Sequence, residues 1–228
     1  MILQASQLTS LSWLEHGFGT SLSSNWPPDP SYVNLRQTHS NIVIEAGQGA
    51  QGVLGEGDGL TTNQPGIWIG VRTADCAPLI LADPVHRAVA AVHAGWRGTV
   101  GGIAAEAIEM MRDSFGTAPG DVVAAVGPAI APCCFEVGAE VAQEFRPWWP
   151  ERTDLDRKTM IDMPGTLFRQ LIEAGLTAAK IDLSPACTHC GADRFHSFRR
   201  DREAAGRMVS AVRIRARPSS TAETRKGA

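Results

Sequence analysis

Three potential metal ligands, His39, Cys76 and His93, stand in loops or at the ends of predicted strands. Two imidazoles and one thiolate around a zinc ion would leave its fourth position open, as in catalytic rather than structural zinc sites. A metal held in this way lowers the pKa of a water and polarises a substrate oxygen or ring nitrogen. The spacing is not that of a zinc finger, so a site requires the fold to bring the three residues together.

The same residues also suit a cysteine-dependent hydrolase. Cys76 would be the thiolate nucleophile and His93 or His39 its base, while Asp75 would orient either arrangement. Spacing alone leaves both chemistries open, beside the simpler alternative that each side chain serves packing or a turn.

An anion site is predicted next to His93. The apolar run 88–92 predicts a buried strand, and a helical pattern begins near Thr99. The turn between them contains Arg97 flanked by Gly95 and Gly98, which allow a ligand to approach the backbone closely. A strand-to-helix turn directs backbone N–H groups, and here a guanidinium, toward one place, so we expect Arg97 to hold an anion.

The remaining pattern predicts one α/β domain. Short apolar runs bounded by turn residues predict strands, and apolar residues at helical spacing predict three helices. Because strands and helices alternate irregularly, we expect mixed sheets with helices outside rather than a regular parallel sheet. The predicted strands are 41–46, 66–71, 78–82, 88–92, 121–126, 180–183 and 208–214, and the helices are 99–115, 138–145 and 164–174.

Composition is that of a globular protein with a substantial core: 43% of the 228 residues are hydrophobic and 20% are charged. A net charge of −3 gives no global electrostatic reason to expect nucleic acid or a membrane as partner. The sequence shows no signal peptide and no apolar run near the roughly 20 residues of a membrane span. We therefore expect a cytoplasmic protein with one catalytic domain over 1–212 and a flexible basic tail over 213–228.

Five cysteines are an odd number and do not indicate a disulfide framework. Cys133 and Cys134 are neighbours, and neighbouring side chains seldom point the same way. Cys187 and Cys190 form a Cys-x-x-Cys motif that has no second such motif nearby, which makes it weak support for zinc. Both pairs are interpreted as structural.

The motifs together resemble a known family. In order they are DGLTT at 58–62, TADCAP at 73–78, HAGWRG at 93–98, GPAI at 127–130 with CFEVG at 134–138, and SFRRD at 197–201. This set is similar to the laccase-domain or multicopper polyphenol oxidase family, whose members are also described as purine nucleoside phosphorylases. The resemblance extends from about residue 14 to about residue 212, and the combination of motifs is very specific.

The resemblance implies a four-layer α/β/β/α fold with mixed sheets, like that of the cytotoxic-necrotizing-factor-type cysteine hydrolases. It implies a zinc site made by His39, Cys76 and His93, with copper as a possible substitute. It also implies phosphorolysis of adenosine, inosine or methylthioadenosine, with adenosine deamination at the same site. Asp75 joins the catalytic residues, and the substrate and phosphate ligands are Arg97, Arg200 and Thr73. The partners implied are a small nucleoside and phosphate, for a monomer or homodimer.

Copper phenol oxidation, which the older family name implies, does not suit the sequence. Multicopper oxidation needs several coppers held largely by paired histidines, and this chain has six histidines and no His-x-His. Two further departures concern the site. The family has Gln-Val-His-Gly where this chain has Gln37-Thr38-His39-Ser40, and it has an arginine near the N-terminus where this chain has Ser21.

Two other functions remain as alternatives. One is a Cys76-dependent amide or peptide hydrolase that edits cell-wall precursors without a metal. The other is a non-catalytic component of a larger assembly, which the intact ligand set disfavours.

Overall fold

A six-stranded mixed sheet forms the centre of the computed structural model, which describes residues 1–216. The strand order is β13 (Ile181–Leu183), β10 (Val123–Val126), β8 (Ala77–Asp83), β9 (Ala88–Ala94), β6 (Gly59–Thr62) and β4 (Val43–Glu45). Every residue of β8 and β9 is buried, which explains why both strands are continuous apolar runs rather than alternating ones. The two strands pair antiparallel along their whole length, and Pro78 lies opposite His93.

A four-stranded antiparallel sheet packs against one face of the central sheet. Its order is β1 (Ile2–Leu3), β2 (Leu14–Gly19), β14 (Met208–Ile214) and β7 (Trp68–Thr73). Side chains from both sheets, among them Phe18, Val71, Ile80 and Val212, form one apolar core between them. Two further strands, β3 (Asn34–Arg36) and β5 (Val53–Glu56), pair in parallel as a separate ladder.

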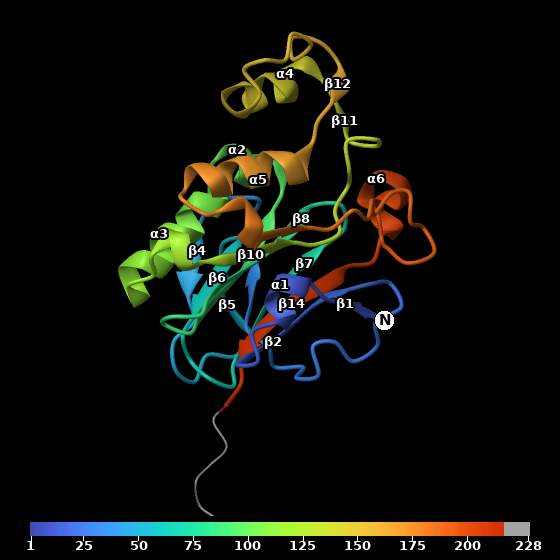
Figure 1. The fold of residues 1–228 in the computed structure, drawn as a ribbon. Helices are drawn as coiled ribbons and strands as arrows, with labels where there is room; N and C mark the ends of the chain where they lie inside the picture. The colour runs from blue at the N-terminus through green and yellow to red at the C-terminus, as the bar shows by residue number, and fades with distance from the viewer. Residues whose placement is uncertain (217–228) are drawn as a thin grey trace, which may run out of the picture.

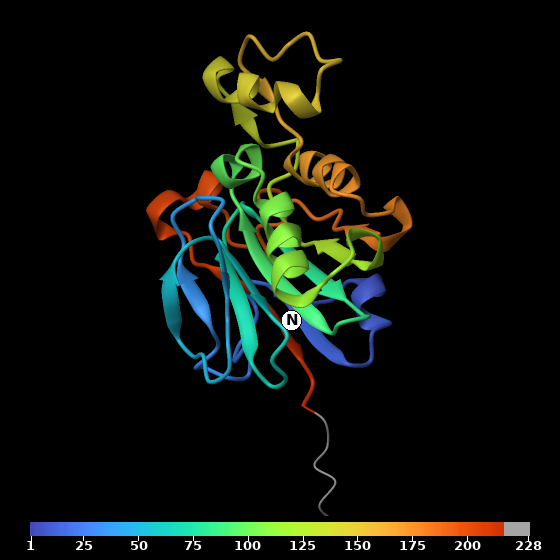
Figure 2. The same ribbon diagram turned by 90° about the vertical axis from the view of Figure 1, so that its left-hand side faces the viewer.

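Helices cover the other face of the central sheet (Figures 1 and 2). The two longest, α3 (Ile103–Phe115) and α5 (Met163–Glu173), bury Met111 and Leu167 in a second apolar core with Leu79 and Leu81. A short helix, α2 (Trp96–Val100), follows β9 directly and contacts both α3 and α5. The fold is thus mixed α/β with several sheets, as predicted.

The outer face of the four-stranded sheet is covered by a loop. Trp26, from the segment between β2 and β3, packs edge-on against Trp68 at a ring-centroid distance of 5.1 Å, and Tyr32 lies against Gly70. These two side chains therefore cover the part of this face that is formed by β7.

A small third core lies at one end of the molecule. The segment that contains β11 (Glu136–Val137), α4 (Ala139–Ala142) and β12 (Thr159–Met160) projects from the sheets in both views (Figures 1 and 2). It has its own buried cluster, which includes Phe145, Leu155 and Ile161 and packs on Trp96 and Val100. The predicted helix 138–145 is α4 followed by a 3₁₀ segment, Gln143–Trp148.

The predicted helix 99–115 is two helices, α2 and α3. Gly101 ends the first helix, and Gly102 adopts the left-handed region at φ 80° before the second begins. Glycine enters this region at little cost, whereas a right-handed helix cannot continue through it. The first helix also begins three residues earlier than predicted, at Trp96.

The domain boundary predicted at residue 212 falls inside a strand. β14 continues to Ile214, and Arg213 and Arg215 both form ion pairs with Glu15 of β2. The rest of the predicted tail, 217–228, lies outside the described residues. No helix among residues 1–216 has both the length and the apolar character needed to cross a bilayer.

The N-terminal segment is held by a buried histidine, His16 of β2, whose Nε2 accepts a hydrogen bond from the Ala5 backbone N–H at 2.9 Å. Burial lowers the pKa of His16 to about 4, although the charge of Asp182 acts in the opposite direction. In the unfolded chain the His16 imidazole takes up a proton near pH 6.5, whereas in the folded protein it remains neutral until the pH is much lower.

We predict that His16 makes the protein less stable in mild acid. Its contribution is complete above about pH 6.5 and is lost as the pH falls toward 4, because only the unfolded chain takes up the proton. From about pH 7.5 to about pH 4.5, the wild type should lose about 1–3 kcal/mol more unfolding free energy than His16→Gln, which can accept the same bond without titrating. Urea unfolding measures the difference, and equal losses in both proteins would contradict the prediction.

Candidate functional site

The fold brings His39, Cys76 and His93 together, and we call them the His–Cys–His group. One ligand atom from each lies within 4.8 Å of the others. The Cys76 Sγ is 3.9 Å from the His39 Nε2, and the two imidazole rings meet edge to face with centroids 4.9 Å apart. Cys76 directly precedes β8 and His93 lies near the end of β9, so the antiparallel register of these strands places them side by side.

The buried carboxylate of Asp58 joins the two histidine-bearing segments. Its Oδ1 accepts from the His93 Nδ1 at 2.7 Å and from the His39 backbone N–H at 3.1 Å. Its Oδ2 accepts from the backbone N–H and the hydroxyl of Ser40, at 2.6 and 2.7 Å, and from Thr38. Asp58 thus fixes the His39 loop and the His93 ring at once, and it leaves the His93 Nε2 free for a ligand.

These hydrogen bonds determine the charge state of Asp58. Burial raises the pKa of the carboxyl, but the bonds from His93 and Ser40 outweigh it and hold the pKa well below its usual range. Asp58 is therefore an anion at neutral pH. The motif at 58–62 contained this residue, but its role was missed because nothing in the sequence shows that 38–40 and His93 meet there.

The pKa values of Cys76 and His93 shift in opposite directions. Burial raises the pKa of the Cys76 thiol, but hydrogen bonds from His39 and His93 lower it to about 6. Burial lowers the pKa of His93, but its bonds to Asp58 and Cys76 raise it to about 9. The thiolate form, which is the form that binds metals or attacks carbon, is thus favoured at neutral pH.

The backbone around the group is constrained. His39 and Asp75 both adopt positive φ angles, 60° and 83°, a region that side-chain-bearing residues rarely occupy and that is common at functional sites. A Cβ at Gly95 would lie 2.7 Å from the His39 ring and 3.3 Å from the Cys76 Sγ. The glycine at the start of the α2 turn is thus required by the close approach of two side chains of the His–Cys–His group.

A pocket of about 890 Å³ opens over the His–Cys–His group, and all three residues line it. Its wall is rich in cations and also carries the aromatic side chains of Trp96, Phe135 and Phe198. The cationic residues are Arg36, Arg72, Arg97, Arg199, Arg202 and Arg207. Such a lining suits a ligand with an anionic group at one end and a flat apolar group at the other.

Arg97, for which the sequence predicts an anion-binding role, lines this pocket. Its guanidinium stacks on the Trp96 ring at 4.2 Å, and no carboxylate or carbonyl of residues 1–216 binds it. Arg72 also lines the pocket, and its side chain likewise has no such partner in this part of the chain. Arg72 was missed because an arginine within a strand has no local feature that separates it from a surface residue.

Asp75 is in the pocket wall, but its carboxylate is occupied. It accepts hydrogen bonds from the hydroxyls of Thr188 and Ser197, at 2.6 and 3.0 Å, and from the Arg199 backbone N–H at 2.6 Å. The residue therefore ties the loop that precedes α6 (Phe198–Asp201) to the segment that carries Cys76.

The other two predicted substrate ligands lie outside the pocket lining. The Arg200 guanidinium binds the carbonyls of Thr188, His189 and Phe195 and pairs with Asp201. Thr73 is buried in β7. Arg199, the neighbour of Arg200 in sequence, lines the pocket instead, because consecutive residues of the helix α6 point in directions about 100° apart.

Known proteins with similar sequences are purine nucleoside enzymes by name. Purine nucleoside phosphorylase from Deinococcus radiodurans is 39% identical over 85% of this chain and 74% of its own length. The protein of that name from Bacteroides thetaiotaomicron is 37% identical, over 78% and 71%. Adenosine deaminase RL5, from an unknown prokaryotic organism, is 39% identical over 68% of this chain and 61% of its own length.

The fold also matches solved structures. YlmD from Geobacillus stearothermophilus superposes with a TM-score of 0.85 at 26% identity, covering 93% of this chain and 94% of YlmD. YfiH from Bacillus licheniformis superposes with a TM-score of 0.80 at 27% identity. Residues 21–215 match the family model described as multi-copper polyphenol oxidoreductase laccase. The resemblance seen in the motifs is thereby confirmed, and the chain belongs to this family, several of whose curated members are named purine nucleoside phosphorylases.

Proposed function

We propose that this chain is a zinc-dependent purine nucleoside phosphorylase that also deaminates adenosine at the same site. The observation that carries the proposal is the meeting, in one pocket, of the His–Cys–His group with the guanidinium of Arg97. The names of the relatives, which include both phosphorylases and a deaminase, support the two activities.

The donor set fits a metal ion. Two imidazole nitrogens and one thiolate suit zinc, although copper also accepts such ligands. The Cys76 thiol is readily ionised, and Asp58 holds the His93 Nδ1 so that the Nε2 faces the other two donors. We propose zinc, which when bound would polarise a substrate or water that shares its remaining position.

Arg97 would bind phosphate. A guanidinium offers paired N–H donors that match phosphate oxygens, and stacking on Trp96 restricts its motion before the ligand arrives. Arg72 would add a second positive charge from the neighbouring wall. Phosphorolysis requires a phosphate oxygen to bond to C1′ of the nucleoside while the C1′–N9 bond breaks and its electron pair leaves with the purine, which takes up a proton.

The purine would lie against the aromatic part of the wall. Trp96, Phe135 and Phe198 provide flat apolar surfaces beside the arginines. In deamination, water adds at C6 of adenine and the amino group leaves as ammonia. Because the Asp75 carboxylate is already bound by three donors, we assign it a positioning role rather than proton transfer.

One observation favours the cysteine hydrolase as a second candidate. Asp58, His93 and Cys76 follow one another in the order of orienting group, base and nucleophile, and Cys76 has a pKa of about 6. Chelation separates the two candidates, since it should abolish the activity of a zinc enzyme and leave that of a thiol hydrolase intact.

We predict that the purified protein releases adenine from adenosine only when phosphate is present. Arg97→Ala should raise the KM for phosphate about 10–100-fold, because charge-assisted hydrogen bonds contribute about 1.5–3 kcal/mol. Arg112→Ala is the matched control, since Arg112 is exposed on α3 and pairs with Glu109. Adenine release that is independent of phosphate, or a metal-free His39→Ala variant with full turnover, would refute the proposed function.

We also predict that Asp58→Asn weakens zinc binding about 10–100-fold, as is typical when the group that orients a histidine ligand is changed. Competition with a chromophoric chelator measures the affinity. Asp83→Asn is a matched control, because Asp83 is also buried and bonds a histidine, His86, at 2.8 Å outside the pocket. Asp83→Asn should lose stability but keep its zinc affinity; an equal loss of affinity in both variants would show that Asp58 acts only through general stability.

A further inference from the structure

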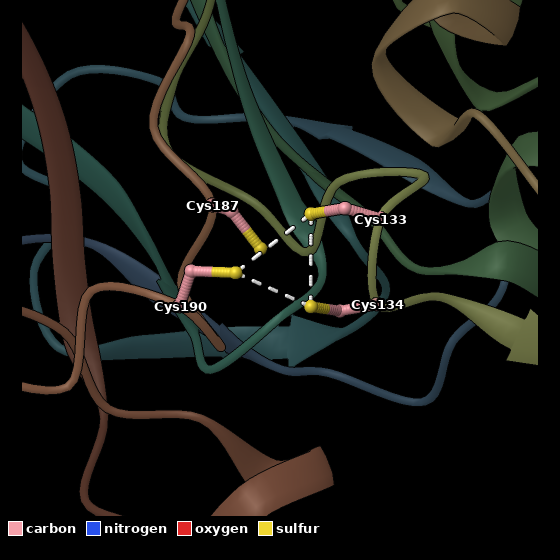
Figure 3. A group of neighbouring side chains, drawn as sticks. All are labelled: Cys133, Cys134, Cys187 and Cys190. Carbon is pink, nitrogen blue, oxygen red and sulfur yellow. Dashed lines mark hydrogen bonds between the residues drawn. The ribbon is translucent and has the colours of Figure 1, made fainter.

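Four cysteines from two distant loops converge beside the pocket, and we call them the four-cysteine group. Cys133 and Cys134 lie in the loop after β10, and Cys187 and Cys190 lie in the loop after β13. Their side chains point toward one another, and all four Sγ atoms lie within 4.8 Å of each other (Figure 3). The Sγ of Cys190 is 3.3 Å from that of Cys134 and 3.8 Å from that of Cys133.

These separations suit a single tetrahedral ion. Zinc–sulfur bonds of about 2.3 Å place the four sulfurs of a tetrahedron about 3.8 Å apart. A disulfide requires a sulfur separation of about 2.05 Å, and all four cysteines are free thiols. Iron–sulfur clusters place several atoms between their thiolates and spread them farther than this compact group.

We propose that the four-cysteine group binds a structural zinc ion, separate from the His–Cys–His group. Four thiolates fill every position of the ion, so this site has no place for substrate or water. Each thiol releases its proton to solvent as it binds, which makes the affinity dependent on pH. Cys133 and Cys190 are exposed, so the ion has a direct route from solvent.

The surroundings compensate the charge of such a site. The Ala131 backbone N–H donates to the Cys187 Sγ at 3.4 Å. The guanidinium of Arg199 binds the Cys134 carbonyl at 3.3 Å, and that of Arg200 binds the His189 carbonyl at 3.0 Å. Arg199 therefore places a positive charge next to Cys134, where it offsets part of the negative charge of a zinc ion with four thiolates, whereas the charge of Arg200 is paired with Asp201.

The ion would fix one wall of the pocket. The loop that carries Cys134 continues into Phe135, and the loop that carries Cys190 leads to Phe198 and Arg199, all of which line the pocket. The Thr188 N–H donates to the Ala129 carbonyl at 3.0 Å, so the two loops already run side by side. A metal that joins them adds a strong link where helices and sheets give little support.

Zinc content measured by elemental analysis tests the proposal. The wild type should hold two zinc ions per chain, Cys76→Ser one and Cys190→Ser one. Cys76 is the matched control because it is the one cysteine outside the group. The ion that remains in Cys76→Ser identifies the four-cysteine site whether or not the proposed function is correct. Cys76→Ser without zinc would overturn the proposal.

Two further measurements keep the test valid if Cys190→Ser folds poorly. Cobalt-substituted Cys76→Ser should show strong thiolate-to-cobalt charge-transfer absorption, and a chelator should lower its melting temperature until zinc is restored.

Denatured wild type prepared without reductant should give five reactive thiols. Three reactive thiols would show a disulfide in place of the metal, and absent cobalt absorption would equally overturn the proposal.

Discussion

The carboxylate of Asp58 is buried among the groups that the site depends on, and a buried charge is tolerated only where hydrogen bonds replace water. Here the donors come from the 38–40 turn and from the His93 ring. Satisfying one carboxylate therefore fixes the positions of two residues that are far apart in sequence. The left-handed backbone of His39 is maintained by the same bonds, since the turn could relax without them.

The two walls of the pocket are held by different means. Cys76 and His93 lie beside and on β8 and β9, two completely buried strands, and Asp58 ties the His39 loop to them. The opposite wall is made of loops, tied by the Asp75 carboxylate and, in our proposal, by zinc at the four-cysteine group. One wall carries the metal ligands, and the other carries aromatic and cationic side chains. This arrangement suits an enzyme that must orient two substrates.

The sequence predicted the strands β8, β9 and β10 because their runs are apolar on both faces and end at turn residues, whereas it did not predict β2 or β6 of the two main sheets. It singled out Arg97, which lines the pocket, because the glycines beside it are a local signal. It did not separate Arg199 from Arg200, since their directions depend on a turn capped by Ser197. The four cysteines were interpreted as two unrelated pairs because their meeting requires β10 and β13 to pair in parallel, which no local pattern reveals.

Anomalous diffraction at the zinc edge, from crystals of the purified protein, tests the central claim most directly. The account predicts a zinc peak about 2.0–2.3 Å from one imidazole nitrogen of His39, the Cys76 Sγ and the His93 Nε2. Asp58 should still accept from the His93 Nδ1 in that structure. A crystal in which these three residues share no metal, while zinc is present elsewhere in the chain, would contradict it.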